Sequence, residues 1–411
     1  MSPEERRVHA EQRARGLCAE EPDFDFDIGV DEEAEDDESE QVGAFQALLQ
    51  DRRKLLGGMA VFLLVVVAIY VVFPKLLGLD DAIDKLDNAV GYWIVIAVAF
   101  NVAAFGAYVA LFRGILTGTR DDDPVRDRLD LRASYQITMA GLAATRIFSA
   151  AGAGGIVLTY WALRKAGMPR RRSACRMVAF LVLMYGVYLL ALVIFGILLR
   201  THVLPGDAPF GGTVVPAAVA AGVVAVFLLI ALIPQDNERR MQSFAGGYRR
   251  TRYLTRLASG PATLSSGVRT AIAYVRNPSR GALGVGGAVG FWAANIAVLW
   301  ASFEAFGGDV PLAVLVQGFF VGMAANLIPS PAGGVGSVDA GMIAAFVLFG
   351  IDESIVFPTV LTYRIIAFWL PIPPGVVAFL QLRGTVARWE RERREGVAAG
   401  GYTSESKVMS R

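Results

Sequence analysis

The sequence has little of what metalloproteins, redox proteins and secreted scaffolds are built from. Of its 411 residues, two are cysteines, two are histidines, and only 19% are charged. Two cysteines are too few for a disulfide framework or a metal cluster. Both histidines, His9 and His202, lie outside the long apolar runs, and no G-x-x-x-x-G-K-[ST] phosphate loop occurs. We therefore expect no metal centre, no cofactor and no catalytic residues, so that the chain is not an enzyme.

Apolar residues, in contrast, are abundant. Hydrophobic residues make up 54% of the chain, and the mean hydropathy is +0.47, well outside the range of soluble globular proteins. A helix of about 20 apolar residues crosses the hydrocarbon core of a membrane. The sequence therefore predicts an all-α polytopic integral membrane protein with six full spans. Their residue ranges are 55–73, 89–112, 177–199, 214–233, 282–306 and 355–382.

The net charge of +1 hides an uneven distribution. Residues 20–40 carry thirteen acidic residues and no basic one. Such a block has little to bury and is expected to be disordered. Residues 1–54 are thus predicted to be a disordered acidic tail, and the late start of the first apolar run, at Leu55, argues against a signal peptide.

Lysines and arginines between the spans predict the orientation in the membrane, because cytoplasmic loops carry an excess of them. Twenty-eight fall in segments on one side and three on the other. We expect a multi-pass plasma-membrane protein whose two termini are both cytoplasmic. The cytoplasmic side would include a basic loop at 234–280 and a C-terminal tail at 383–411.

Two further apolar stretches are each broken by small residues or proline. Residues 133–168 begin and end among arginines, whereas 311–350 begins and ends in segments poor in Lys and Arg. The second contains the helix-breaking run NLIPSPAGGVGSVDAG. Each half is shorter than the roughly 20 residues of a span. Both are therefore predicted to be re-entrant helical hairpins that enter the membrane from opposite sides.

The two stretches also resemble each other. Residues 141–157 (GLAATRIFSAAGAGGIV) and 322–338 (GMAANLIPSPAGGVGSV) are identical at nine of seventeen aligned positions. Opposite orientation would make them an inverted repeat, an arrangement by which many transporters build a substrate site near the bilayer midplane. The alternative is that both tips only allow close helix packing, as small residues do in membranes.

The run PSPAGGVGSVDAG, followed by LTYRIIAFW, resembles the C-terminal signature of the lysylphosphatidylglycerol synthase transmembrane family, which includes the flippase domain of the multiple peptide resistance factor. The resemblance covers residues 55–382 and implies translocation of an aminoacylated phospholipid between leaflets. This chain departs from the family in having Asp339 where glutamate is usual and Phe148 where a proline is usual. We expect no aminoacyl-transferase domain, so the chain would move such a lipid without making it.

Carrying a phosphate through the membrane requires hydrogen-bond donors, which helix N-termini, glycine-rich backbone and arginines supply. Arg364 lies about ten residues into its predicted span. It is predicted to contact the phosphate or to be a partner of Asp339; the alternative is a purely structural ion pair. Arg146 has the same two readings. Asp339 either complements the helix dipole, couples protons or binds a lipid amine. The candidate substrate-binding residues are Arg146, Ser149, Gly152, Gly154, Gly155, Ser330, Gly333, Gly334, Gly336, Ser337, Asp339 and Arg364.

The expected partners follow from the same features. The main hypothesis is a flippase whose partner is a membrane phospholipid. The basic loop, which interleaves arginines with aromatic residues, is expected to lie on an anionic lipid surface, and no nucleic acid is expected. The alternative is a non-transporting membrane partner or regulator of a separate lipid-modifying enzyme. An embedded glycosyl- or acyl-transferase has no identifiable nucleophile or base here.

Overall fold

The computed structural model describes residues 90–117, 124–147, 153–232, 251–327 and 334–408. The described part of the chain contains helices and their connections but no strand, which confirms the all-α prediction. Five helical segments are long and apolar enough to cross a membrane. They are α6 (Gly91–Leu116), α10 (Arg170–Arg200), α11 (Phe210–Ala231), α14 (Pro278–Ala305) and the segment Glu353–Glu395.

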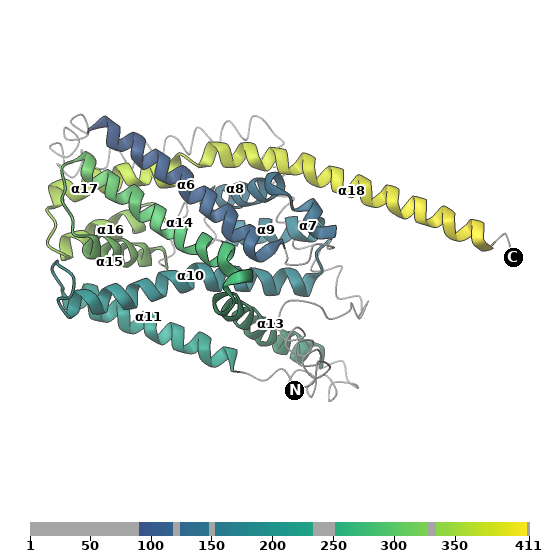
Figure 1. The fold of residues 1–411 in the computed structure, drawn as a ribbon, viewed down its shortest axis with the longest axis horizontal. Helices are drawn as coiled ribbons and strands as arrows, with labels where there is room; N and C mark the ends of the chain where they lie inside the picture. Colours follow the sequence, from purple (N-terminus) through teal and green to yellow (C-terminus); the bar gives the residue numbers. More distant parts are fainter. Residues whose placement is uncertain (1–89, 118–123, 148–152, 233–250, 328–333, 409–411) are drawn as a thin grey trace.

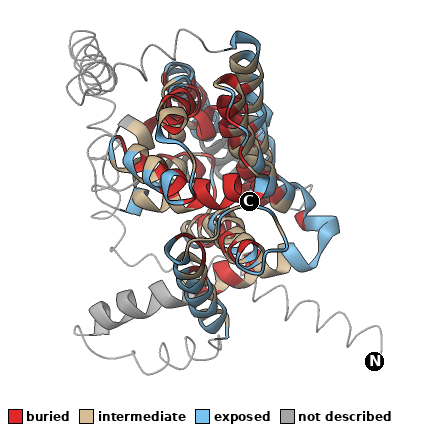
Figure 2. Cartoon of the chain, turned by 90° about the vertical axis from the view of Figure 1, so that its left-hand side faces the viewer, coloured by how far each residue is buried: buried red, intermediate tan, exposed pale blue. Residues whose placement is uncertain are grey.

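These five segments correspond to five of the six predicted spans. The remaining one, at residues 55–73, lies outside the described residues, as does the predicted acidic tail 1–54. Figure 2 shows that buried residues gather inside the bundle and exposed ones on its outer faces. Many of the outward side chains are apolar, such as Val219 at 63% and Leu229 at 64% exposure. An apolar outer surface is what contact with lipid requires, because lipid tails are as apolar as leucine.

Helices α6 and α14 pack against each other along much of their length. A side chain on Gly114 or Gly287 would overlap backbone atoms of the opposite helix, at Gly284 and Leu111 respectively. Glycine at these positions lets the two backbones approach closely, as is common between membrane helices. This pair is the most extensive helix–helix contact in the described part of the chain.

Two pairs of shorter helices occupy opposite ends of the long ones (Figure 1). The first consists of α8 (Leu131–Ile147) and α9 (Ala153–Lys165). The second consists of α15 (Leu312–Met323), a 3₁₀ turn η3 (Ala324–Leu327) and α16 (Ser337–Leu348). The breaks lie where the glycine-rich runs predicted them.

Both pairs end in the same type of turn. Gly167 and Gly350 adopt positive φ angles of 99° and 81°. In each turn the glycine N–H donates to the carbonyl three residues back, and the next N–H donates to the carbonyl five residues before it. This is the left-handed C-cap that glycine favours. Beyond it, each pair is followed by a long helical segment, α10 or α17 (Glu353–Arg364).

The predicted span 355–382 lies within the candidate spanning segment Glu353–Glu395, but its helix is irregular near its middle. Helix α17 passes into a π-helical turn η4 (Ile365–Trp369), and α18 (Ile372–Val408) begins after Pro371. Proline lacks a backbone N–H and disrupts a helix interior, and the sequence LPIPPG at 370–375 has three prolines. Helix α18 also continues well beyond residue 382, through most of the predicted C-terminal tail, and projects past the bundle (Figure 1).

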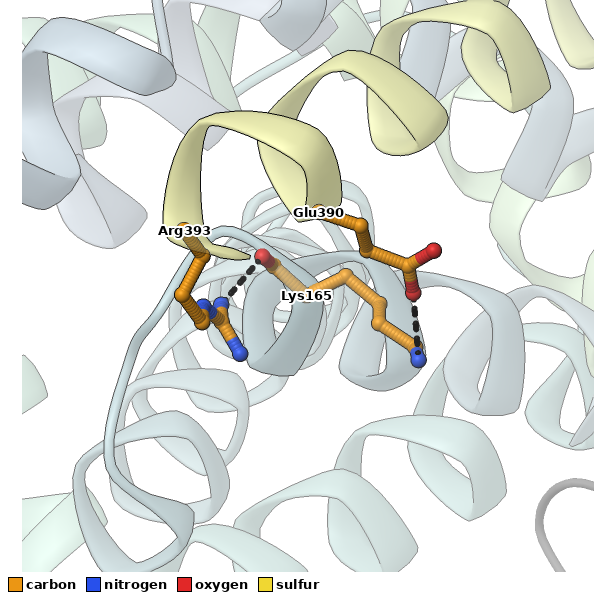
Figure 3. A network of polar contacts seen from close by, with 3 residues as sticks. All are labelled: Lys165, Glu390 and Arg393. Atoms are coloured by element: carbon orange, nitrogen blue, oxygen red, sulfur yellow. Dashed lines mark hydrogen bonds and ion pairs between the residues drawn. The ribbon is translucent and has the colours of Figure 1, made fainter. Parts of the chain in front are cut away.

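Helix α18 packs along α8, and it also contacts α9. Figure 3 shows this junction, in which Lys165 Nζ forms a 2.7 Å ion pair with Glu390 Oε1. Arg393 Nη2 donates to the Lys165 carbonyl at 2.8 Å. In the other half, α10 packs on α15. Each short pair therefore contacts a long helix from the opposite half of the sequence.

The predicted basic loop 234–280 is not a loop throughout. Residues 251–276 form α13 (Thr251–Arg276), which packs against α10 and α14. A short helix, α7 (Pro124–Arg128), precedes α8. Arg269 Nε donates to the Ala231 carbonyl at the end of α11, at 2.8 Å. This bond satisfies one of the carbonyls that a helix C-terminus leaves unpaired.

Candidate functional site

The tips of the two short helix pairs converge on the break in the last long segment. Within the π-turn, Leu370 N donates to Ile365 O at 2.9 Å, one residue further back than in an α-helix. This shift leaves the Ile366 carbonyl without its usual donor. Because Pro371 has no N–H, the Ala367 carbonyl also has no donor four residues ahead. The break thus presents carbonyl groups that need partners from other helices.

Side chains from α6 and α8 supply those partners. Asn101 Nδ2 donates to Ile366 O at 2.8 Å. Arg146 donates to two successive carbonyls, from Nη1 to Phe368 O at 2.6 Å and from Nη2 to Ala367 O at 2.8 Å. A planar guanidinium suits two adjacent acceptors, since its donors have a fixed fork geometry. Arg146, in the last turn of α8, therefore joins the first helix pair to the broken helix.

Arg364 joins the second pair to the same place. Its Nε lies 2.5 Å from Asp339 Oδ1, with side-chain exposures of 5% for the arginine and 16% for the aspartate. Its Nη2 donates to Gly334 O at 3.1 Å. The other carboxylate oxygen, Asp339 Oδ2, accepts from Gly336 N at 2.9 Å and so caps the start of α16. Asp339 thus has two protein contacts: it caps the first turn of α16, and it is the partner of Arg364.

Both arginines contact one aromatic ring. The guanidinium carbon of Arg364 lies 4.4 Å from the ring centroid of Phe368, and that of Arg146 lies 5.1 Å from it. Cations within about 6 Å of a ring centroid are attracted by its quadrupole. Two positive groups, carried by different halves of the chain, are therefore held near each other around Phe368.

The Asp339 side of this cluster is open. Nothing lies within 4 Å of where a side chain on Gly336 would be, and Gly336 has a φ of 84°, which glycine adopts readily. Gly336 is itself exposed. Leu327 at the neighbouring tip is 87% exposed and Ile365 is 46% exposed. A polar helix start and apolar side chains thus lie next to each other at an accessible face.

The other candidate residues divide into two groups. Gly154 and Gly155 lie in the first turn of α9. A side chain on Gly155 would overlap Thr145 Oγ1 and lie 2.5 Å from Gly141 O, so this glycine packs tightly against α8, in line with the packing alternative. Its aligned counterpart Gly336 faces open space instead. Ser149, Gly152, Ser330 and Gly333 lie outside the described residues.

The sequence did not predict the role of Phe368, nor the carbonyls of the π-turn that lack a donor within their own helix. The signal for the carbonyls was present in the prolines that follow Leu370, but a 28-residue apolar run fitted a single span. Phe368 carried no signal of its own, because one phenylalanine among apolar residues is unremarkable until its neighbours are known.

Comparison with known proteins gives two findings. The sequence profile of the family described as the lysylphosphatidylglycerol synthase TM region matches residues 58–375. A protein described as a UPF0104 membrane protein, from Methanothermobacter thermautotrophicus, is 32% identical over 87 residues. That alignment covers 21% of this chain and 26% of the relative, so the chain spans about a quarter of that relative's length.

Proposed function

The chain belongs to the lysylphosphatidylglycerol synthase transmembrane family, and from that premise we propose that it is a lipid flippase. Its substrate would be a phospholipid with an anionic or aminoacylated head group, or a related phosphate-bearing lipid. The observation that carries the proposal is the pair of arginines, Arg146 and Arg364, that two separate helix pairs bring to Phe368. Arginine binds phosphate strongly because its donors match the spacing of phosphate oxygens.

The membrane arrangement is part of the proposal. Both helix pairs are re-entrant hairpins related as an inverted repeat, and both chain termini lie on the cytoplasmic side of the plasma membrane. Three observations support this: the excess of Lys and Arg in one set of segments, the shortness of the paired helices, and their positions at opposite ends of the long ones (Figure 1). Two further observations agree with a repeat. Both helix pairs end in the same glycine turn, and each pair packs on a long helix from the other half of the sequence, α18 for the first pair and α10 for the second.

In this arrangement the phosphate passes the exposed start of α16 beside Gly336, and Arg364 offers positive charge there. The acyl chains remain in lipid beside Leu327 and Ile365. Moving from Arg364 towards Arg146 would take the phosphate from one hairpin to the other. The basic helix α13 and its flanking residues would rest on anionic lipid, as basic segments beside spans do.

The test is lipid movement in vesicles that contain the purified full-length chain and fluorescent phospholipids. Arg146→Gln and Arg364→Gln should each reduce the rate by tenfold or more, because each removes a charged donor. Arg391→Gln, an exposed change on α18, should leave the rate unchanged. Lipid movement that is unaltered per folded molecule in both tip variants would overturn the proposal.

A second candidate is a non-transporting partner or regulator of a separate lipid-modifying enzyme. The projection of α18 past the bundle favours it, since this helix offers a surface that the bundle does not cover (Figure 1). Under this hypothesis the purified chain moves no lipid, and shortening α18 after Glu395 abolishes co-purification of the enzyme. Under the flippase hypothesis, the same truncation leaves lipid movement intact.

A further inference from the structure

A second polar site lies away from the hairpin tips, between the start of the first helix pair and the part of α18 beyond the predicted span. It is a cleft of about 380 Å³, formed by α7, the first turn of α8 and residues 385–392 of α18. Known small-ligand sites begin at about 300 Å³. The cleft is therefore large enough for the head group of one phospholipid.

The charged groups of the cleft are balanced, and several are uncommitted. Arg128 Nη1 donates to the Ala166 carbonyl at 3.2 Å, and Asp130 Oδ1 accepts from Ala133 N at 2.6 Å. In the described part of the chain, no hydrogen bond or ion pair to protein is made by the other four charged residues that line the cleft. These are Asp127, Arg132, Arg388 and Glu392.

The walls of the cleft are held in place by contacts on either side. Thr385 Oγ1 donates to Gln136 Oε1 at 2.8 Å, and this joins α18 to α8. Lys165 and Arg393, both outside the cleft, tie the same part of α18 to α9 (Figure 3). Trp389, only 5% exposed, forms part of the lining. Two free arginines and two free carboxylates are thus presented by helices whose separation is fixed.

Exposed apolar side chains lie on the same two helices that form the cleft. Leu131 and Tyr135 of α8 are 62% and 41% exposed, and Val377 and Leu380 of α18 are 52% and 46% exposed. A ligand that pairs with the charged residues of the cleft and also covers these apolar side chains has a charged head group and an apolar body. Tryptophan and tyrosine also concentrate where a membrane protein meets the head-group region.

We infer that this cleft binds the head group of a zwitterionic phospholipid, with the phosphate on Arg132 and Arg388 and the amine on Asp127 and Glu392. The inference deepens the proposed function and rests on its membrane orientation, which places the cleft at the cytoplasmic surface. It does not rest on lipid movement. The cleft should bind a head group with both charges more tightly than one with phosphate alone, because an unpaired carboxylate beside bound phosphate is unfavourable.

Native mass spectrometry of the full-length chain in detergent tests the inference. The probes are phosphatidylethanolamine and phosphatidylglycerol with identical acyl chains. The wild type should retain more phosphatidylethanolamine. Asp127→Asn combined with Glu392→Gln should weaken phosphatidylethanolamine binding about tenfold and leave phosphatidylglycerol binding unchanged or stronger. Arg132→Gln combined with Arg388→Gln should weaken binding of both lipids.

The matched controls are Arg391→Gln and Glu395→Gln, exposed residues of α18 that do not line the cleft. They should not alter either affinity. The inference is overturned if the carboxylate variant keeps the wild-type lipid ratio, or if the controls change binding as much as the cleft variants. It is also overturned if soluble phosphoethanolamine binds as tightly as the lipid, because the apolar part would then contribute nothing.

The outcome is separable from that of the flippase proposal. If Arg146→Gln stops lipid movement while the cleft variants bind lipids as the wild type does, only the cleft inference fails. If the cleft variants behave as expected but the wild type moves no lipid, only the flippase proposal fails.

Discussion

Two ion pairs of this protein have opposite surroundings. Arg364 and Asp339 lie inside the bundle at 5% and 16% exposure, whereas Lys165 and Glu390 lie at its surface at 40% and 38%. Removing one member of a buried pair leaves the other charge uncompensated in a medium of low dielectric constant. At the surface, water takes over from the lost partner. The same kind of substitution should therefore have unequal effects at the two places.

Arg364→Gln should lower the free energy of unfolding by about 3–5 kcal/mol, measured by denaturation in detergent micelles. Lys165→Gln, the matched control, should change it by at most about 1 kcal/mol. The double change Arg364→Gln with Asp339→Asn should recover part of the loss, since neither charge is then left alone. Equal effects of Arg364→Gln and Lys165→Gln would contradict the assignment of Arg364 to a buried pair.

Arg146→Lys tests the two carbonyl bonds at the π-turn. Lysine keeps the charge but lacks the fork of donors, so one of Ala367 O and Phe368 O should lose its partner, at a cost of about 1–3 kcal/mol. Hydrogen exchange at the Leu370 amide should become faster. Arg164→Lys is the control, because Arg164 Nη1 donates to a single carbonyl, Met168 O, at 2.9 Å, and a lysine can replace this bond. Unchanged exchange at Leu370 in Arg146→Lys would show that the turn does not depend on this side chain.

At the scale of elements, close contact between α8 and α9 depends on the absence of a side chain at Gly155. Gly155→Ala should force the helices apart and destabilise the protein by about 1–3 kcal/mol, measured as a loss of thermal stability. Gly106→Ala provides the comparison. It lies in α6 with no atom within 4 Å of the new methyl group, and should be neutral or stabilising by about 0.5–1 kcal/mol. Equal stability of the two variants would contradict this prediction, because it would mean that α8 and α9 can move apart at no cost in stability.

The elements differ in how far the sequence predicted them. The breaks before Ala153 and Ser337 were predictable, because glycines and prolines cluster there between runs too short to span a membrane. The break at Ile365 was not, since proline is tolerated inside membrane helices when neighbouring groups satisfy the freed carbonyls. Those neighbours, Asn101 and Arg146, are 265 and 222 residues away from the carbonyls they bind. Nothing in the local sequence identifies such partners, whereas the partnership of Arg364 with Asp339 could be proposed because two charges in apolar surroundings need compensation.

At the scale of the whole molecule, the proposed orientation predicts which ends of the helices face the cytoplasm. Asp309→Cys, in an exposed connection before α15, should react with a membrane-impermeant thiol reagent added outside intact cells. Arg391→Cys, exposed on α18, should react only after the cells are opened, each signal being corrected for the unmodified chain. Labelling of Arg391→Cys in intact cells, or of Asp309→Cys only in opened ones, would reverse the orientation.

Helix α18 is joined to the first helix pair at three depths. Arg146 holds the turn before its start, Gln136 holds Thr385, and Lys165 holds Glu390 and Arg393. We expect these ties to make α8, α9 and α18 act as one rigid lever, with the π-turn as its pivot. From Ile372 to Arg393 the lever is about 32 Å long, so a tilt of about 10° at the pivot displaces its far end by about 6 Å. Motion of the first tip in the bundle would thus appear at the opposite end as a swing of α18 together with α9.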